Sequence, residues 1–122
     1  MLATSVESAT SEELLADVRV MIIDDHRAMR SIVRALLAKS GITSVTEAED
    51  GDTALELLET YNVKLPSLII CDLHMERMDG MEFCNMLRRH KKKEIAQIPV
   101  LVLTGDSNRL GHEVAEQAGA VK

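Results

Sequence analysis

The chain has 122 residues, a formal net charge of −6 and a composition that is 46% hydrophobic and 28% charged. This length suits one domain with a core of its own, and this balance excludes both a disordered chain and a membrane protein, since no apolar run approaches the roughly 20 residues of a membrane span. The negative charge disfavours non-specific nucleic-acid binding, because the phosphates would repel the chain.

The N-terminal end predicts a leader and a cytoplasmic location. Residues 1–10 are small and rich in Ser and Thr, without hydrophobic periodicity, so we expect a flexible leader before a single domain over 11–122. Residues 1–13 contain no Lys or Arg and therefore lack the basic start of a secretory signal. Cys71 and Cys84 both lie in apolar patterns, which predicts buried thiols rather than a disulfide.

The first half of the chain alternates strand and helix patterns. Residues 18–23 form an apolar run typical of a central strand covered on both faces. An amphipathic helix is predicted next, ending at Gly41, with its basic residues turned outward. Its apolar face consists of Met29, Ile32, Val33, Leu36 and Leu37. Residues 42–48 are more polar and predict an edge strand, after which Asp52 is expected to cap a second helix.

The second half repeats this alternation. Residues 68–71 and 100–103 are apolar runs typical of central strands. Between them Gly80 opens a helical pattern that leads into the basic segment 88–93, whose cations suit the C-terminal end of a helix. A fourth helical pattern carries Leu110, Val114, Ala115 and Ala118. Strands alternating with helices predict an α/β fold with an open, doubly wound parallel sheet.

Polar side chains stand where the three apolar runs end. Asp24 and Asp25 follow the first run, Asp72 the second and Thr104 the third. Parallel sheets bind ligands at the carboxyl ends of their strands, so these side chains are expected to converge. Two carboxylates about 4 Å apart repel by about 4 kcal/mol at an effective dielectric constant of about 20. A divalent cation with oxygen ligands, Mg²⁺ above all, would relieve this repulsion.

A carboxylate beside such a cation is able to attack a phosphoryl donor and form an acyl phosphate. The Thr104 hydroxyl and the backbone N–H of Gly105 are then expected to donate hydrogen bonds to the phosphoryl oxygens.

This arrangement resembles the CheY-like receiver family of bacterial response regulators. That family has an acidic pair after the first strand, an acceptor aspartate after the third and a hydroxyl residue after the fourth. Further landmarks of the family lie in segments 47–51, 72–80 and 118–120. The resemblance implies a flavodoxin-like sheet with strand order 2-1-3-4, and it covers nearly the whole chain from Val18 to Ala120.

The resemblance also assigns roles to the site residues. Asp72 would be the phosphoacceptor and a Mg²⁺ ligand, with Asp25 a direct ligand, Asp24 acting through water and the His74 backbone carbonyl completing the set. Thr104 would be the switch residue that moves toward the phosphoryl group. The chain would thus be no enzyme beyond catalysing its own phosphorylation and dephosphorylation.

The phosphoryl donor implied by the family is a sensor histidine kinase or a histidine phosphotransfer protein. Partner choice in this family is read from the first helix, so Arg27, Arg30 and Arg34 are candidates for the kinase-docking face. The output partner is unknown, and neither direct nucleic-acid binding nor membrane binding is expected.

The chain departs from the family pattern in three places. Glu76 stands where the family has proline, which is expected to loosen the loop, and Gly105 replaces a common alanine. Lys122 comes three positions after Gly119, too early for the family lysine, so the fifth strand and fifth helix are expected to be missing. The fourth strand would then be a bare apolar edge, predicting a dimer or a domain swap.

Two alternative functions remain open. A pseudo-receiver that only binds other proteins is favoured by Glu76 and by the absent lysine, although every carboxylate is retained. A haloacid-dehalogenase-like phosphatase would need a second acid two residues after the nucleophile, where His74 stands.

Overall fold

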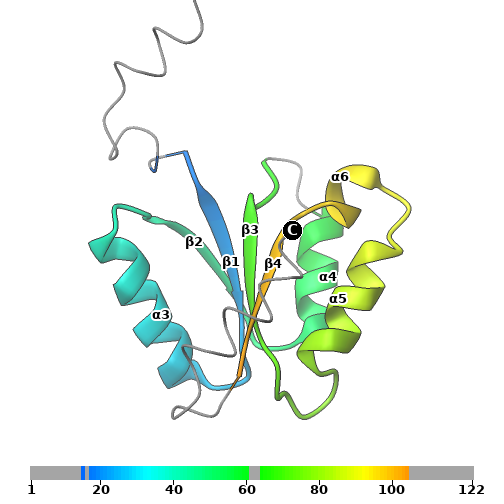
Figure 1. The fold of residues 1–122 in the computed structure, drawn as a ribbon, viewed down its shortest axis with the longest axis horizontal. Coiled ribbons are helices and arrows are strands. Elements are labelled where there is room, and N and C mark those ends of the chain that lie inside the picture. Colours follow the sequence, from blue (N-terminus) through cyan, green and yellow to red (C-terminus); the bar gives the residue numbers. More distant parts are fainter. Residues whose placement is uncertain (1–14, 16, 61–63, 105–122) are drawn as a thin grey trace, which may run out of the picture.

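A computed structural model describes residues 15, 17–60 and 64–104 (Figure 1). Strands and helices alternate along them in the order β1 (Arg19–Ile23), α3 (Arg27–Lys39), β2 (Ser44–Ala48), α4 (Gly51–Thr60), β3 (Leu68–Asp72), α5 (Gly80–Arg88), α6 (Lys93–Ala96) and β4 (Val100–Leu103). The strands form one parallel sheet in the order β2-β1-β3-β4, which confirms the predicted flavodoxin-like architecture. The predicted leader and the fourth helical pattern lie outside the described residues.

One face of the sheet carries the larger core. Helices α4, α5 and α6 cover this face, while α3 covers the other (Figure 1). Met21, Ile69 and Val102 of the strands pack with Phe83 and Leu87 of α5, and all five side chains are buried. Cys71 and Cys84 belong to the same cluster as free, buried thiols, as predicted. Burying these side chains fixes α5, whose N-terminal residue Gly80 lies close to the backbone of Asp72 at the end of β3.

The opposite face is covered less completely. Val33 and Leu37 of α3 pack against Val20, Ile22 and Ile70 of the sheet. The other members of the predicted apolar face of this helix are exposed by 44%, 54% and 58%, namely Met29, Ile32 and Leu36. The helix is amphipathic as predicted, but of the five residues on its apolar face only Val33 and Leu37 pack against the sheet. Periodicity identifies the apolar side of a helix. Because α3 is the only described helix on this face, the part of its apolar side that does not contact the sheet has no other described helix to pack against.

Local capping explains where the helices begin and end. Asp50, rather than the predicted Asp52, caps α4, since its Oδ1 accepts a hydrogen bond of 2.7 Å from the Thr53 N–H. Gly41 adopts a φ of +92° just after α3, as expected for the residue that ends a helix. At α5, Asp79 and Glu82 form a reciprocal capping box. This box starts α5 directly after the loop that follows β3.

None of the helices in the described ranges is long and apolar enough to cross a membrane.

Candidate functional site

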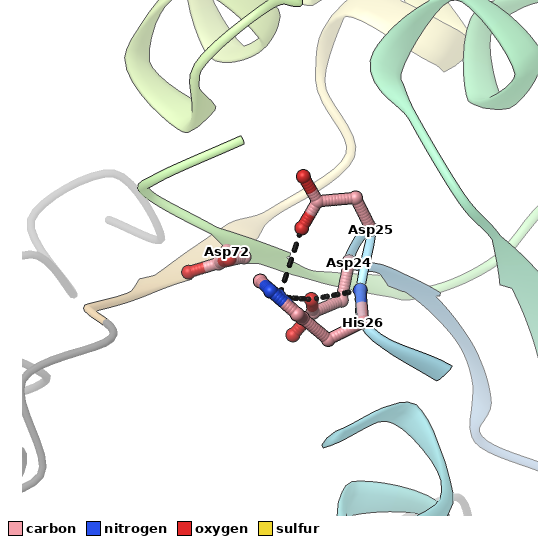
Figure 2. A group of neighbouring side chains, drawn as sticks. All are labelled: Asp24, Asp25, His26 and Asp72. Atoms are coloured by element: carbon pink, nitrogen blue, oxygen red, sulfur yellow. Dashed lines mark hydrogen bonds and ion pairs between the residues drawn. The ribbon is translucent and has the colours of Figure 1, made fainter. Parts of the chain in front are cut away.

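The carboxyl ends of β1 and β3 bring three aspartates together. Asp24 and Asp25 follow β1, Asp72 ends β3, and the two strands are neighbours in the sheet. One ligand atom from each aspartate, together with one from His26, lies within 4.8 Å of the others (Figure 2). The acidic convergence expected from the strand ends is therefore present.

Asp24 is the most buried acid of this group. It is 6% exposed, and its Oδ1 accepts a hydrogen bond of 2.8 Å from the His26 N–H. Its backbone carbonyl accepts a hydrogen bond from Arg30 Nη1. The loop between β1 and α3 is thus fixed by side-chain contacts at both ends.

Arg30 points inward, contrary to the predicted outward orientation. Its side chain is 14% exposed, and its Nε donates to Glu47 Oε1 at 2.9 Å. Arg34 also binds Glu47 but remains 49% exposed, whereas Arg27 is exposed. The hydrogen bond from Arg30 is the largest influence on Glu47 and helps to hold the pKa of that carboxyl below its usual value. Arg30 therefore serves the structure of the β1–α3 loop, and Arg27 and Arg34 remain the accessible docking candidates.

The loop after β3 is tied to Asp25. The Glu76 N–H donates to Asp25 Oδ2 at 3.2 Å, a hydrogen bond that proline could not make because it has no N–H. The expected loosening by Glu76 is thus offset by a direct link across the site. On the outer side of the same loop, Arg77 forms an exposed ion pair of 3.1 Å with Asp52 of α4.

Asp72 is partly buried and carries an unfavourable charge. Burial is the main factor that raises the pKa of its carboxyl, and the negative charges of Asp24 and then Asp25 add to the effect. A 3.3 Å hydrogen bond from the His74 N–H to Asp72 Oδ1 opposes the shift. The free carboxylate is therefore destabilised by its surroundings, and a cation would stabilise it.

Thr104 directly follows β4, which neighbours β3 in the sheet. It follows Leu103, which is the register partner of Asp72, and it is 6% exposed. Its hydroxyl has no hydrogen-bond partner among the described residues, an unusual state for a buried polar group. Gly105 lies outside the described residues, and the predicted role of the His74 carbonyl remains a prediction.

The donor set suits a divalent cation. Asp25 Oδ1 is buried without a hydrogen bond of good geometry in the described part of the chain, although His26 Nδ1 lies 2.9 Å away. A neighbouring pocket is lined by Asp25, Glu49, Asp50, Met75, Glu76 and Arg77. Four of these residues are acidic and one is basic, so the approach to the site attracts cations. Oxygen ligands of this kind fit Mg²⁺.

Two features of the site were missed in the sequence. The ring of His26 is 73% exposed, yet its Nδ1 lies 3.3 Å from Asp24 Oδ1 and 2.9 Å from Asp25 Oδ1. Its position directly after the acidic pair was the available signal. The hydrogen bond from the Glu76 N–H could not be predicted, because residue type does not show where a backbone N–H will lie.

Comparisons with known proteins agree with this geometry. The family model of the response regulator receiver domain matches residues 20–122 of this chain. The chain is 33% identical to the chemotaxis protein CheY of Pseudomonas aeruginosa over 101 residues, covering 83% of this chain and 77% of the relative. It is 32% identical to the chemotaxis protein CheY-3 of Vibrio cholerae over 103 residues, covering 84% and 75%.

Solved structures give the same assignment. The receiver domain of the histidine kinase CKI1 from Arabidopsis thaliana, in complex with Mg²⁺ and BeF₃⁻, superposes with a TM-score of 0.68 at 26% identity, covering 90% of this chain and 80% of that one. The Vibrio cholerae chemotaxis protein CheY4 gives a TM-score of 0.64 at 27% identity, covering 87% and 83%. The chain therefore belongs to the response regulator receiver domain family of two-component systems.

Proposed function

We propose that this receiver accepts a phosphoryl group on Asp72 in a Mg²⁺-dependent reaction and changes its surface to signal. The observation that carries the proposal is the meeting of Asp24, Asp25 and Asp72 at the carboxyl end of the sheet. Further support comes from the CKI1 receiver domain, a fold relative that was crystallised with Mg²⁺.

Each residue has a distinct task in this reaction. Asp25, Asp72 and the His74 carbonyl would bind Mg²⁺ directly and Asp24 would act through water, and the ion would supply positive charge against the transferred phosphoryl group. An Asp72 carboxylate oxygen attacks the phosphorus atom, and the bond from phosphorus to the donor breaks, with the donor leaving group keeping the electron pair. Thr104 Oγ1 and the Gly105 N–H donate to the phosphoryl oxygens. Movement of Thr104 toward those oxygens would give its buried hydroxyl a partner and shift the chain that follows it.

Intact-mass spectrometry with a small phosphoryl donor tests this proposal. The 122-residue chain incubated with acetyl phosphate should gain a phosphoryl adduct with Mg²⁺ and none with EDTA, since three uncompensated carboxylates repel the incoming phosphate. A chain that binds Mg²⁺ but forms no adduct would instead be a pseudo-receiver that works only by binding proteins. Adduct formation that is equal with and without Mg²⁺ would contradict the metal role.

The natural donor would be a sensor histidine kinase or a histidine phosphotransfer protein, in the cytoplasm of a bacterium. Of the two exposed docking candidates, Arg27 lies at the start of α3, next to the site. Arg27→Glu should slow phosphotransfer about tenfold from a kinase that phosphorylates the unmodified chain, because a charge is reversed at the interface. Uptake from acetyl phosphate should stay the same. Lys39→Glu, the same charge change at the far end of α3, is the matched control, and equal slowing by both variants would contradict docking at Arg27.

We also propose self-association through β4. In the described part of the sheet β4 is the outermost strand, and its Leu101 and Leu103 are only partly buried. Analytical ultracentrifugation should therefore show a concentration-dependent dimer. A single monomeric species across a hundredfold concentration range would refute this proposal.

A further inference from the structure

His26 places an imidazole nitrogen among the oxygen atoms of the acidic site. Its Nδ1 lies 2.9 Å from Asp25 Oδ1 and 3.3 Å from Asp24 Oδ1, and the ring sits between the two carboxylates and Asp72 in Figure 2. The backbone holds it there, because the His26 N–H donates to Asp24 Oδ1 and the His26 carbonyl accepts from the Arg30 N–H.

These distances match those between adjacent ligands of a metal ion. In an octahedral site with metal–ligand bonds of about 2.1 Å, neighbouring ligand atoms lie roughly 3.0 Å apart. The Nδ1 separations from the two carboxylate oxygens bracket this value. A cation could therefore bind Nδ1 and both aspartates with only small side-chain movements.

The protonation of the ring allows such a role. Carboxylates only accept hydrogen bonds, so without a metal the contact of Nδ1 with Asp24 Oδ1 requires the hydrogen on Nδ1. Ligation requires the other tautomer, with a free lone pair on Nδ1 and the hydrogen on Nε2. Because the side chain is 73% exposed, water can accept the hydrogen bond of Nε2.

We propose that His26 is a nitrogen ligand of the metal site and shifts its preference from Mg²⁺ toward first-row transition-metal ions. This inference rests on the proposed Mg²⁺-binding role of the same aspartates. Mg²⁺ strongly prefers oxygen ligands, whereas imidazole favours ions later in the first transition row. One nitrogen in an otherwise oxygen-ligated site therefore discriminates between the two classes of ion.

The test uses the full chain with Mn²⁺ and Co²⁺ as probes. Pulsed EPR of bound Mn²⁺ should show coupling to an imidazole ¹⁴N nucleus, and His26→Gln should remove it. In calorimetry, His26→Gln should bind Co²⁺ at least about tenfold more weakly than the unmodified chain. Loss of a residue that only hydrogen-bonds to a metal ligand already costs about that much. The affinity for Mg²⁺ should stay within about threefold, because Mg²⁺ gains little from imidazole.

The control is His90→Gln, which removes a ring that pairs with Glu59 beyond the C-terminal end of α5 and should keep the ¹⁴N coupling. Suppose that Mn²⁺ bound to the unmodified chain shows no ¹⁴N coupling and that its binding is lost in Asp25→Asn. This result would overturn the His26 inference and leave the aspartate site standing. A ¹⁴N signal that survives His26→Gln would overturn it as well. Failure of any divalent ion to bind would overturn both this inference and the proposed function.

Discussion

Replacing Asp72 by asparagine should abolish the Mg²⁺-dependent phosphoryl adduct formed with acetyl phosphate. The amide oxygen is a poor nucleophile and carries no charge to share with a cation, so the adduct should fall to background in intact-mass spectra. Asp52→Asn is the matched control, since Asp52 lies on α4, where it makes an exposed ion pair with Arg77, and its replacement should leave the adduct intact. An adduct of undiminished yield on Asp72→Asn would move the acceptor to another acid.

Asp72→Asn should also make the folded chain more stable at neutral pH when no metal is present. The native pKa of Asp72 lies above its ordinary value of 3.8, so ionisation of this carboxyl is harder in the folded chain than in the unfolded one. The unmodified chain therefore loses stability as the pH rises from the unfolded to the native pKa. Asp72→Asn does not lose stability over this pH range. The free energies of unfolding of the variant and of the unmodified chain should therefore be nearly equal at about pH 3, and that of the variant should be higher at pH 7.

Urea titrations at both pH values measure this difference. Mg²⁺ should reverse it, because a ligand at about 100 times its Kd stabilises the folded state by about 2.7 kcal/mol. Only the unmodified chain should gain that much. A variant less stable than the unmodified chain at pH 7 without metal would contradict the charge repulsion inferred for the site.

Gly80→Ala should be the most destabilising single methyl addition in the site region. A Cβ at this position would lie 2.6 Å from the Asp72 carbonyl oxygen and 3.0 Å from Leu73 Cα, both of which are backbone atoms of the acceptor strand and loop. The Gly80 N–H also donates to the Leu73 carbonyl at 2.9 Å, so α5 cannot move away without breaking this contact. We expect a loss of about 3 kcal/mol in the free energy of unfolding, together with weaker phosphoryl uptake.

Gly51→Ala is the matched control for this prediction. Its added Cβ would meet Met78 Sδ at 2.6 Å and Phe83 Cδ1 at 3.3 Å, and the Met78 side chain can change rotamer. Alanine in a helix also gains up to about 1 kcal/mol over glycine, so the net change should be within about 1 kcal/mol. Equal costs for the two variants in urea unfolding would contradict the close approach of α5 to the acceptor strand.

The fold class and the acidic cluster can both be predicted from the order of residues alone. Continuous apolar runs such as 68–71 and 100–103 are distinctive of buried parallel strands, and helical periodicity separates them. The carboxyl ends of such strands meet at one edge of the sheet, so a polar residue after each run reveals the site without coordinates. Asp24, Asp25 and Asp72 were found in this way.

The contacts that support the site become visible only in the folded chain. Residue type did not reveal that Arg30 turns inward to Glu47, that His26 Nδ1 faces two carboxylates or that the Glu76 N–H reaches Asp25. The exposure of Met29 on α3 could not be read from periodicity either. The physical reason is common to all four. A local pattern fixes which element forms and which side of it is apolar, whereas the partner of each side chain or backbone donor depends on what other segments bring to the same place.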